Sequence, residues 1–420
     1  MRIKITIKIK IKNMTPPAVT KPTRVNLRTP DVMAAVQAQV ESHYRSEVVE
    51  KLRATGGTLT CDGLTVRLAK QFGFCYGVER AIDLAYAAAK VFTDRRLFIL
   101  GEIIHNPEVN EQIAALGIRN LIPPHQQAEV EDLTAEDVVI VPAFGTDVKT
   151  LARIKELGCQ IVDTTCGDVM SVWKRVRQNA SDDVTSIIHG KATHEETKAT
   201  ASRAVVAGKG HYLIVLTLAD TDYVCDYIRR SGDKAAFLEK FRGAYSEGFD
   251  PDLHLRRIGV ANQTTMMRGE TEEVQRRVEA AMRDRDGAEK ARESFRFFDT
   301  ICGATQERQD ALRDMLAAPM DLLIVVGGYN SSNTSHLAEM GEGRLPTYFI
   351  RNATRLESRE RITHFDQHAK REVTTDGWLH ERPLIVGITA GASCPNNLIE
   401  ETILRLYELY GISAGRLLGG

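Results

Sequence analysis

Residues 65–90 read TVRLAKQFGFCYGVERAIDLAYAAAK: a short β-branched run leads to Cys75, and an amphipathic helical pattern follows. The same order recurs around Cys166, in CQIVDTTCGDVMSVWKRVRQ at 159–178, and around Cys302, in FRFFDTICGATQERQDALRDML at 295–316. From 75 to 166 and from 166 to 302 the cysteines are 91 and 136 residues apart, which is domain-sized. The sequence therefore predicts three similar α/β lobes that each present one cysteine to a shared centre.

The rest of the chain continues this alternation of short β-branched runs and amphipathic helical stretches. The runs that predict strands are TVRLA at 65–69, RLFIL at 96–100, DVVIVPAF at 137–144, CQIVDTT at 159–165, VTSIIHG at 184–190, YLIVLT at 212–217, LRRIGVAN at 255–262, FRFFDT at 295–300, DLLIVVGG at 321–328 and PLIVGITAG at 383–391. Strands that alternate with helices of this length predict βαβ units and mainly parallel sheets. In such sheets ligands bind at the carboxyl ends of the strands.

The domain organisation follows from the spacing of the three junctions. We expect an N-terminal extension and helix at 1–64, lobes at 65–165 and 166–297, and a third lobe with a C-terminal tail at 298–420. A helix is predicted from Asp31 to the Gly56-Gly57 break. The basic segment 1–30 receives no function, because a disordered tail, an edge strand, a true start at Met14 and a transit peptide all remain open.

Composition excludes several classes of protein. The 420 residues are 43% hydrophobic and 26% charged, with a formal net charge of -1, so no global field attracts nucleic acid. No apolar run of about 18 residues predicts a membrane span, and no secretory signal is recognisable, so we expect a cytoplasmic protein. The seven cysteines include no CxxC, which argues against a disulfide scaffold or a zinc ribbon.

Cysteines at helix N-termini suit metal ligation, because the helix dipole and free N–H groups favour the thiolate. Three thiolates fit either a zinc ion or an iron–sulfur cubane in which one iron lacks a cysteine. Cys394 occupies a similar junction, so the residues alone leave it open as a ligand or nucleophile. The remaining cysteines, in or beside ordinary strand or helix patterns, are interpreted as structural: Cys61, Cys159 and Cys225.

Other strand ends are rich in hydroxyls, amides and imidazoles, the donors that a phosphate needs at a helix N-terminus. These junctions are EIIHNP at 102–107, HGKATHEET at 189–197, NQTT at 262–265, NSSNTS at 330–335 and AGAS at 390–393. Each could be a simple helix cap, and no P-loop motif is present. His194 and Glu196, two residues apart before a helix, could serve an anion and a proton transfer, although a surface salt bridge is the simpler reading.

At these motifs the chain closely resembles the LytB/IspH family of hydroxymethylbutenyl diphosphate reductases, especially its plant and cyanobacterial branch. The resemblance runs from about Ser42 to Glu401. Its carriers are GFCYGVERA, GEIIHNPEVN, VDTTC, SIIHGKATHEETKATAS, DYVCDYI, GFDPD, ANQTTM with GETEE, ICGATQERQDA, VVGGYNSSNTSHL and GITAGAS.

The resemblance implies a reductive dehydroxylation of 4-hydroxy-3-methylbut-2-enyl diphosphate to isopentenyl and dimethylallyl diphosphates. It implies a [4Fe–4S] cluster on Cys75, Cys166 and Cys302, and no ligand role for Cys394. The implied diphosphate pocket comprises His105, His194, Ser331, Ser332, Asn333 and Ser393; the implied acid is Glu196, and the substrate-facing hydroxyl is Thr264 with Thr265 alongside. No GxGxxG motif follows a strand, so a bound nicotinamide cofactor is not expected. The expected electron donor is therefore a ferredoxin or flavodoxin. The competing hypotheses are a non-catalytic iron–sulfur redox sensor and a zinc hydrolase.

Two departures from the family pattern bear on the site. Phe144 stands where the shorter bacterial branch has a third pocket histidine, which removes one expected diphosphate contact, although the plant-like branch shares the phenylalanine. Gly167 and Asp168 follow Cys166 where a proline is usual, and we expect this change to affect the surroundings of the cluster.

Overall fold

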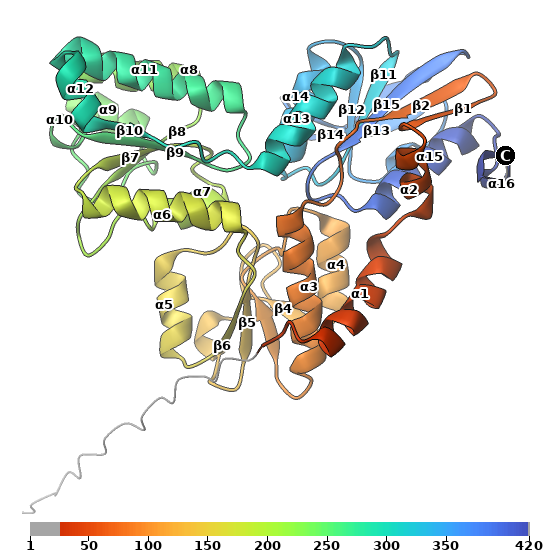
Figure 1. Cartoon of the computed structure of the whole chain (residues 1–420), viewed down its shortest axis with the longest axis horizontal. Helices are drawn as coiled ribbons and strands as arrows, with labels where there is room; N and C mark the ends of the chain where they lie inside the picture. The colour runs from red at the N-terminus through yellow and green to blue at the C-terminus, as the bar shows by residue number, and fades with distance from the viewer. Residues whose placement is uncertain (1–25, 419–420) are drawn as a thin grey trace, which may run out of the picture.

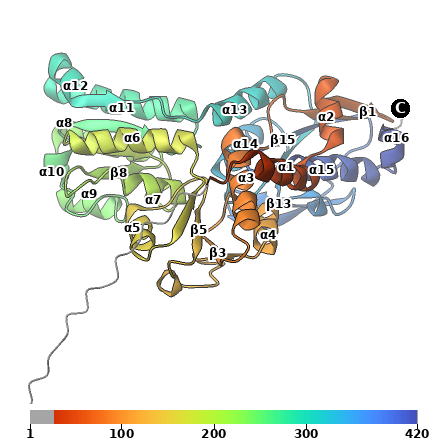
Figure 2. The same cartoon turned by 60° about the horizontal axis from the view of Figure 1, so that its bottom comes forward.

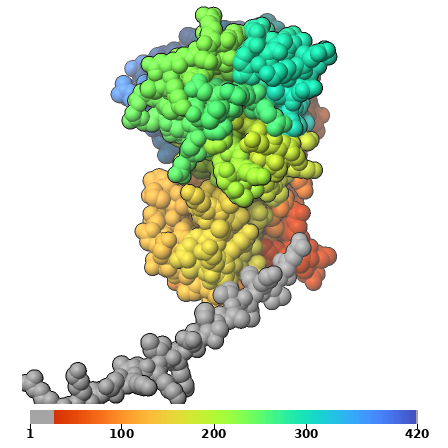
Figure 3. Space-filling view, turned by 90° about the vertical axis from the view of Figure 1, so that its left-hand side faces the viewer, coloured from red at the N-terminus to blue at the C-terminus, as the bar shows by residue number. Residues whose placement is uncertain are grey.

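A computed structural model describes residues 26–418 and shows three α/β lobes arranged around a common centre (Figure 1). In the space-filling view the lobe coloured green to cyan lies above the lobe coloured orange to yellow (Figure 3). The basic segment up to residue 25 lies outside the described residues. Among residues 26–418, every helix is too short or too polar to cross a bilayer.

The first lobe holds a four-stranded, fully parallel sheet in the order β4-β3-β5-β6. Its elements are α1 (Pro30–Tyr44), α3 (Tyr76–Val91), β3 (Leu97–Ile99), α4 (Pro107–Ala115), β4 (Ile118–Asn120), the short 3-10 helix η1 (Val130–Asp132), β5 (Val138–Val141), α5 (Val148–Glu156) and β6 (Gln160–Asp163). Val138 and Ile140 of β5 join one core cluster, while Val139 and Val141 join another on the opposite face. Successive side chains of a strand point to opposite faces, so an all-apolar run is buried on both sides.

The second lobe has a parallel sheet in the order β10-β9-β7-β8. Its elements are α6 (Gly167–Ser181), β7 (Thr185–His189), α7 (Glu195–Ala201), β8 (Tyr212–Val215), α8 (Leu218–Arg230), α9 (Lys234–Lys240), α10 (Pro251–His254), β9 (Ile258–Asn262), α11 (Arg268–Asp286), α12 (Ala288–Ser294) and β10 (Phe295–Phe297). Helix α6 lies very close to β9, because a Cβ at Gly259 would stand 2.3 Å from the amide nitrogen of Asn179. Only glycine allows this approach.

The third lobe has a five-stranded sheet in the order β1-β2-β15-β11-β12, in which only the β1–β2 pair is antiparallel. Its elements are α2 (Glu47–Ala54), β1 (Thr58–Cys61), β2 (Leu64–Leu68), α13 (Gly303–Leu316), β11 (Leu322–Val326), α14 (Ser332–Glu342), β12 (Thr347–Ile350), the short 3-10 helix η2 (Ala353–Arg355), β15 (Leu384–Ala390), α15 (Asn396–Leu409) and α16 (Ala414–Leu418). An antiparallel hairpin of β13 (Arg361–Asp366) and β14 (Arg371–Asp376) lies beside it.

The predicted α/β class with mainly parallel sheets is confirmed, and all ten predicted strand runs contain a strand. Two expectations need correction. Strand β2, expected to open the first lobe, pairs with β15 in the sheet of the third lobe. The single N-terminal helix is two helices, because the chain turns out of α1 at Arg45 and the Ser46 hydroxyl caps α2 by accepting the Val49 N–H at 2.9 Å.

The three sheets present their strand ends to the centre in the same order. In each sheet the strand that leads to a cysteine lies next to two further parallel strands. The three sets, with the strand that leads to the cysteine first, are β6-β5-β3, β10-β9-β7 and β2-β15-β11. Parallel neighbours end at the same edge, so each cysteine has the polar junctions of two adjacent strands beside it. The view turned by 60° shows the three lobes meeting where these edges face one another (Figure 2).

Candidate active site

The three junction cysteines are all N-cap residues. Cys75 precedes α3, Cys166 precedes α6 and Cys302 precedes α13, each with extended backbone angles and without a side-chain cap bond. Backbone N–H groups in the first turn of α6 and of α13 nevertheless favour the ionised sulfurs of Cys166 and Cys302.

Each of these cysteines is tied through its backbone to the end of the neighbouring strand. Cys75 N–H donates to Ala392 O at 3.3 Å, Cys166 N–H to Ala143 O at 2.8 Å, and Cys302 N–H to Thr264 O at 3.3 Å. These bonds join each cysteine loop to a loop that also carries pocket residues.

Two of the three sulfurs lie on either side of a glycine. A Cβ at Gly77, in the first turn of α3, would stand 2.6 Å from Cys166 Sγ and 3.9 Å from Cys75 Sγ. Glycine therefore leaves room between two lobes for both sulfurs. Cys302 lines the same cavity, but the three sulfurs do not form a group of ligand atoms within 4.8 Å of one another, so this donor set fits an iron–sulfur cubane better than a single zinc ion.

Burial changes the expected ionisation of these thiols. It raises the pKa of Cys302 to about 12, with a further contribution from Asp168, and burial also raises the pKa of Cys166. The expectation that the helix dipole favours the thiolate is therefore wrong at Cys166 and Cys302 for the protein alone, since desolvation outweighs the dipole. A strongly positive ligand would reverse the balance, because metal binding requires and stabilises the thiolate.

The other cysteines lie apart from this space. Cys394 is fully buried in a core cluster with Leu398 and Ile399, and burial raises its pKa. Its sulfur has the Pro395 carbonyl as its acceptor at 3.7 Å. This environment supports the structural interpretation of Cys394.

One cavity of about 110 Å³ collects every residue that the sequence singled out for the site. Its lining includes Cys75, Cys166, Cys302, His105, His194, Glu196, Thr264, Thr265, Ser331, Ser332, Asn333 and Ser393. The thiols and the polar donors therefore open onto the same space, although they come from three different sheets.

His105 is oriented by a carboxylate and an aromatic ring. Its Nδ1 lies 2.8 Å from Glu102 Oε2, and its ring stacks on Phe144 at 4.6 Å between centroids with a 12° interplanar angle. Burial opposes ionisation of Glu102, but hydrogen bonds from His105 and Asn330 hold its pKa below the usual value. The Glu102 carboxylate holds Nδ1 and so fixes the ring, while Nε2 of His105 is buried without a hydrogen-bond partner. Phe144 thus supports the histidine although it cannot donate.

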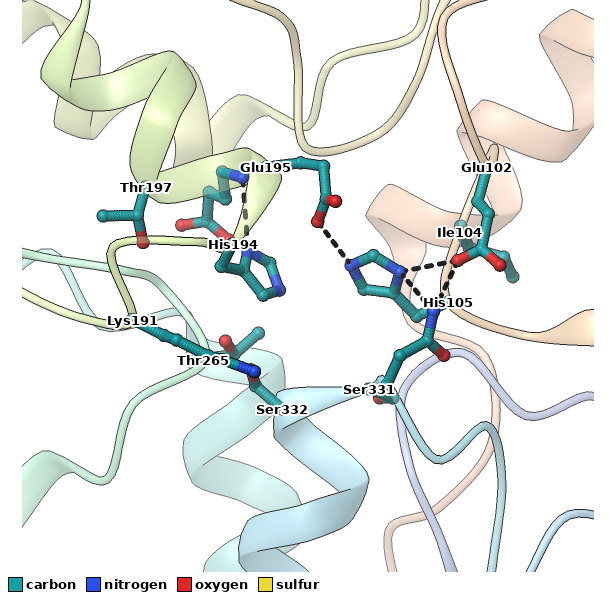
Figure 4. Close-up of polar contacts among 12 residues, drawn as sticks. Glu102, Ile104, His105, Lys191, His194, Glu195, Thr197, Thr265, Ser331 and Ser332 are labelled. Carbon is teal, nitrogen blue, oxygen red and sulfur yellow. Dashed lines mark hydrogen bonds and ion pairs between the residues drawn. The ribbon is translucent and has the colours of Figure 1, made fainter. Parts of the chain in front are cut away.

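His194 is a neutral donor. Its Nδ1 accepts the Glu196 N–H at 3.2 Å, and burial, followed by the neighbouring charges, lowers its pKa well below 6.5. A neutral imidazole that accepts at Nδ1 must carry its proton at Nε2. That Nε2 is buried without a hydrogen-bond partner, so its N–H is free for a ligand. Figure 4 shows both imidazoles facing the space between the loops.

Glu196 and Thr264 form a bonded pair across two loops. Thr264 N–H donates to Glu196 Oε1 at 2.6 Å, and the Thr264 hydroxyl donates to Oε2 at 3.0 Å. Burial raises the pKa of Glu196 to about 7 despite these two bonds. The carboxyl is therefore protonated in a large fraction of molecules at neutral pH, and its proton has a route through a hydroxyl.

The third lobe supplies hydroxyl and amide groups at the start of α14. Ser331 caps this helix, and its hydroxyl lies 3.3 Å from that of Ser393. Asn333 Oδ1 accepts the Ala392 N–H at 2.9 Å, which leaves its amide nitrogen buried and without a partner. Free N–H groups at a helix start are suited to a phosphate.

Comparison with protein families matches the LytB protein family over residues 66–407. The chain belongs to the LytB family. It is 47% identical to the 4-hydroxy-3-methylbut-2-enyl diphosphate reductase of Gloeobacter violaceus, over 90% of this chain and 91% of that protein. It is 45% identical to the reductase of the same name from Thermosynechococcus vestitus, over 90% of this chain and 93% of that one.

Two solved structures share the LytB fold. One is an (E)-4-hydroxy-3-methyl-but-2-enyl diphosphate reductase, the terminal enzyme of the non-mevalonate pathway, at TM-score 0.50 and 24% identity, covering 82% of this chain and 99% of that one. The other is the E-1-hydroxy-2-methyl-but-2-enyl-4-diphosphate reductase of Plasmodium falciparum, at TM-score 0.59 and 20% identity, covering 81% and 87%.

Sequence reasoning missed three residues of this LytB site. Alternation of side chains along the HEET loop predicts that Glu195, next to Glu196, points away from the pocket. This prediction is wrong, because Glu195 Oε2 lies 3.7 Å from His105 Nε2 (Figure 4). Gln263 donates to the hydroxyls of Thr265 at 2.7 Å and Ser332 at 3.0 Å and so joins two loops. Glu102 was quoted only as part of a junction. All three stand in the recognised motifs, but the motif does not give the direction of a side chain.

A second set of potential metal ligands stands at the border of this cavity, which two of its three members line. His105, His194 and Glu195 each offer one ligand atom, and these atoms lie within 4.8 Å of one another. The two imidazoles equally suit an anion, provided that the half-exposed Glu195 carboxylate turns away from them. The Nε2–H of His194 has no partner and can donate to an anion, which favours an anion over a metal ion here.

Proposed function

We propose that this LytB chain is a 4-hydroxy-3-methylbut-2-enyl diphosphate reductase that removes the substrate hydroxyl and yields isopentenyl and dimethylallyl diphosphates. The observation that carries the proposal is the single cavity in which three helix-capping thiols face imidazole, hydroxyl and amide donors and one buried acid. The relatives that bear this name, which match about nine-tenths of the chain, support it. A redox sensor without catalysis would have no use for the donors.

Cys75, Cys166 and Cys302 would hold a [4Fe–4S] cluster in this proposal. When bound, a cubane ligated by three cysteines supplies one open iron as a Lewis acid and a source of electrons. The thiols fit the group, since all three line one cavity and Gly77 leaves room for the sulfurs of Cys75 and Cys166.

The polar donors would hold the diphosphate. Nε2 of His105 is buried without a hydrogen-bond partner, and His194 can donate from Nε2 as a neutral ring. The serines at the start of α14 and the Asn333 amide add donors on the opposite side of the cavity. Binding energy gained at the diphosphate can orient the reacting C–O bond, which lies at the other end of the small substrate.

Glu196 would deliver protons to the leaving hydroxyl and the product carbon. The overall change consumes two electrons and two protons and releases water. The Thr264 hydroxyl lies 3.0 Å from Glu196 Oε2. When Glu196 is protonated, this hydrogen bond can reverse, so that the acid donates to Thr264 Oγ1 and the Thr264 hydroxyl gives its own proton to the substrate. Thr265 stands beside it and is held by Gln263.

The electrons would come from a ferredoxin or flavodoxin.

A cytoplasmic location is part of the same proposal, because none of the seven cysteines forms a disulfide and free thiols persist in a reducing compartment.

The cluster assignment is tested with four variants purified without oxygen. Cys75→Ser, Cys166→Ser and Cys302→Ser should each lose the brown iron–sulfur absorbance, most of the bound iron and the turnover of substrate. Cys394→Ala is the matched control, because this thiol is buried in the core and faces no cavity residue. Loss of the cluster in Cys394→Ala, or zinc in place of iron in the wild type, would contradict the proposal.

A further inference from the structure

Arg308 is a buried cation in the second turn of α13, the helix that begins after Cys302. Its exposed fraction is 3%. Among residues 26–418, no carboxylate oxygen lies within the 4.0 Å of an ion pair with its guanidinium. A buried charge is costly unless it is paired and hydrogen-bonded, so this arginine requires an explanation.

The hydrogen bonds of Arg308 all run to backbone carbonyls. Nη1 donates to Ala304 O at 2.7 Å on its own helix, while Nε and Nη2 donate to Gly73 O and Nη2 also donates to Phe74 O at 3.2 Å. Gly73 and Phe74 directly precede Cys75. The guanidinium therefore ties the helix of Cys302 to the loop of Cys75.

The backbone at Gly73 is built for this contact. Its φ is +78°, and a Cβ there would stand 2.7 Å from the side-chain oxygen of Asn396, so another residue would be strained. The left-handed turn lets the Gly73 carbonyl accept from two nitrogens of Arg308.

Arg308 lies beside the loops of two cysteines. Its guanidinium bonds the carbonyls of Gly73 and Phe74, the two residues before Cys75, and its own helix begins directly after Cys302. Consistent with this placement, burial lowers the pKa of Arg308, and Cys75 and Cys302 are the groups that most strongly oppose this. In a poorly solvated interior the field of the guanidinium on anything bound to the sulfurs of Cys75 and Cys302 is strong.

We propose that Arg308 is a positioning residue that holds the Cys75 and Cys302 loops in register and makes the cluster bound there easier to reduce. The inference rests on the cluster assigned under the proposed function. Reduction adds one negative charge to the cluster, and a fixed positive charge beside two of its ligands stabilises the reduced form.

Asp168 offers a charge of opposite sign at the same place. It lies in the first turn of α6 after Cys166, lines the cavity and is the second cause, after burial, that raises the pKa of the Cys302 thiol. Its carboxylate should make the cluster harder to reduce.

The test is the midpoint potential of the cluster in the intact, loaded protein, measured by redox titration followed at the visible absorbance. Arg308→Met should reduce the ratio of reduced to oxidised cluster at fixed potential at least tenfold, a fall of 59 mV for a one-electron couple. Arg308→Lys keeps the charge and should stay within threefold of wild type, while losing iron faster because it cannot bond all the carbonyls. Asp168→Asn should shift the midpoint in the opposite direction.

An unchanged midpoint in loaded Arg308→Met, or an equal fall in Arg308→Lys, would overturn the role of the charge. If Arg308→Met holds no cluster, Arg308→Gln, which keeps donors without charge, replaces it. Loss of the cluster from all three arginine variants would also overturn the electrostatic role, since geometry alone would explain it. Absence of a cluster in the wild type would instead refute the proposed function, so the two failures are distinguishable.

Discussion

The replacement Glu196→Gln tests both the ionisation and the role of the buried acid. Burial raises the pKa of Glu196 from 4.5 to about 7, so the folded protein must deprotonate this carboxyl at a cost that the unfolded chain does not bear. At 1.36 kcal/mol per pH unit, that cost reaches about 3 kcal/mol above pH 7. Glutamine keeps the shape and can bond both groups of Thr264, but it never ionises.

The sign of the effect follows from the raised pKa. The contribution of the Glu196 carboxyl to the stability of the folded protein is complete below pH 4.5 and is lost as the pH rises through about 7. Between pH 5.5 and 8.5 the wild type should therefore lose about 2 kcal/mol relative to Glu196→Gln. Urea denaturation of the cluster-free protein at the two pH values measures this difference directly.

Turnover provides the second readout. With a chemical reductant, Glu196→Gln should bind substrate and keep its cluster but lose turnover by roughly 10²–10⁴-fold, as for a missing general acid. The wild-type rate should fall on the alkaline side, at or above pH 7, because bound diphosphate favours the neutral acid further.

A matched control is Glu270→Gln, whose carboxyl also has a pKa raised by burial but lies on α11 outside the cavity. Parallel pH dependence of the stability of wild type and Glu196→Gln, or near-normal turnover in Glu196→Gln, would refute the reasoning.

Three further changes probe the anion pocket and the sulfur cradle. His105→Phe removes a charge-assisted bond worth roughly 1.5–3 kcal/mol, so calorimetry on the oxidised enzyme should show substrate binding at least about tenfold weaker; an unchanged dissociation constant would place the anion elsewhere. Glu195→Gln removes a half-exposed carboxylate that faces His105, and binding should tighten by about fivefold or less; weaker binding would show that Glu195 assists the ligand. Gly77→Ala places a methyl group 2.6 Å from Cys166 Sγ at an overpacking cost of about 1–3 kcal/mol, so iron per chain should fall markedly, and full iron content would show that the sulfurs can move apart.

The local pattern was enough to predict the strands that lead to the site, because each is a short run rich in apolar residues followed by an amphipathic helix, even where the strand is only partly buried, as in β6 and β10. It could not predict which strands pair. TVRLA lies next to the first lobe in sequence, yet β2 pairs with β15, more than 300 residues away, and no local signal encodes that partner. Strands β13 and β14 were missed because most of their side chains are partly or fully exposed, so polar residues stand on both faces.

Motifs identified the residue types of the site but neither their directions nor their ionisation. Two adjacent glutamates in the HEET motif look equivalent in sequence, yet Glu196 is buried against Thr264 and Glu195 faces His105. The helix dipole was a sound reason to expect a thiolate at Cys302, but the depth of burial that opposes it arises only when three lobes meet. Such depth is a tertiary property.

The placement of one cysteine on each of three sheets also has a consequence for the lifetime of the protein. A group bound by all three sulfurs closes chain loops of 91 and 136 residues, from 75 to 166 and from 166 to 302. By the chain-entropy reasoning applied to cross-links, closing a loop of about 100 residues is worth several kcal/mol, about 4.7 in that treatment. Oxidative loss of the group that the three sulfurs bind would remove the link between all three lobes at once. Damage by oxygen would therefore be followed by local unfolding and exposure to proteases.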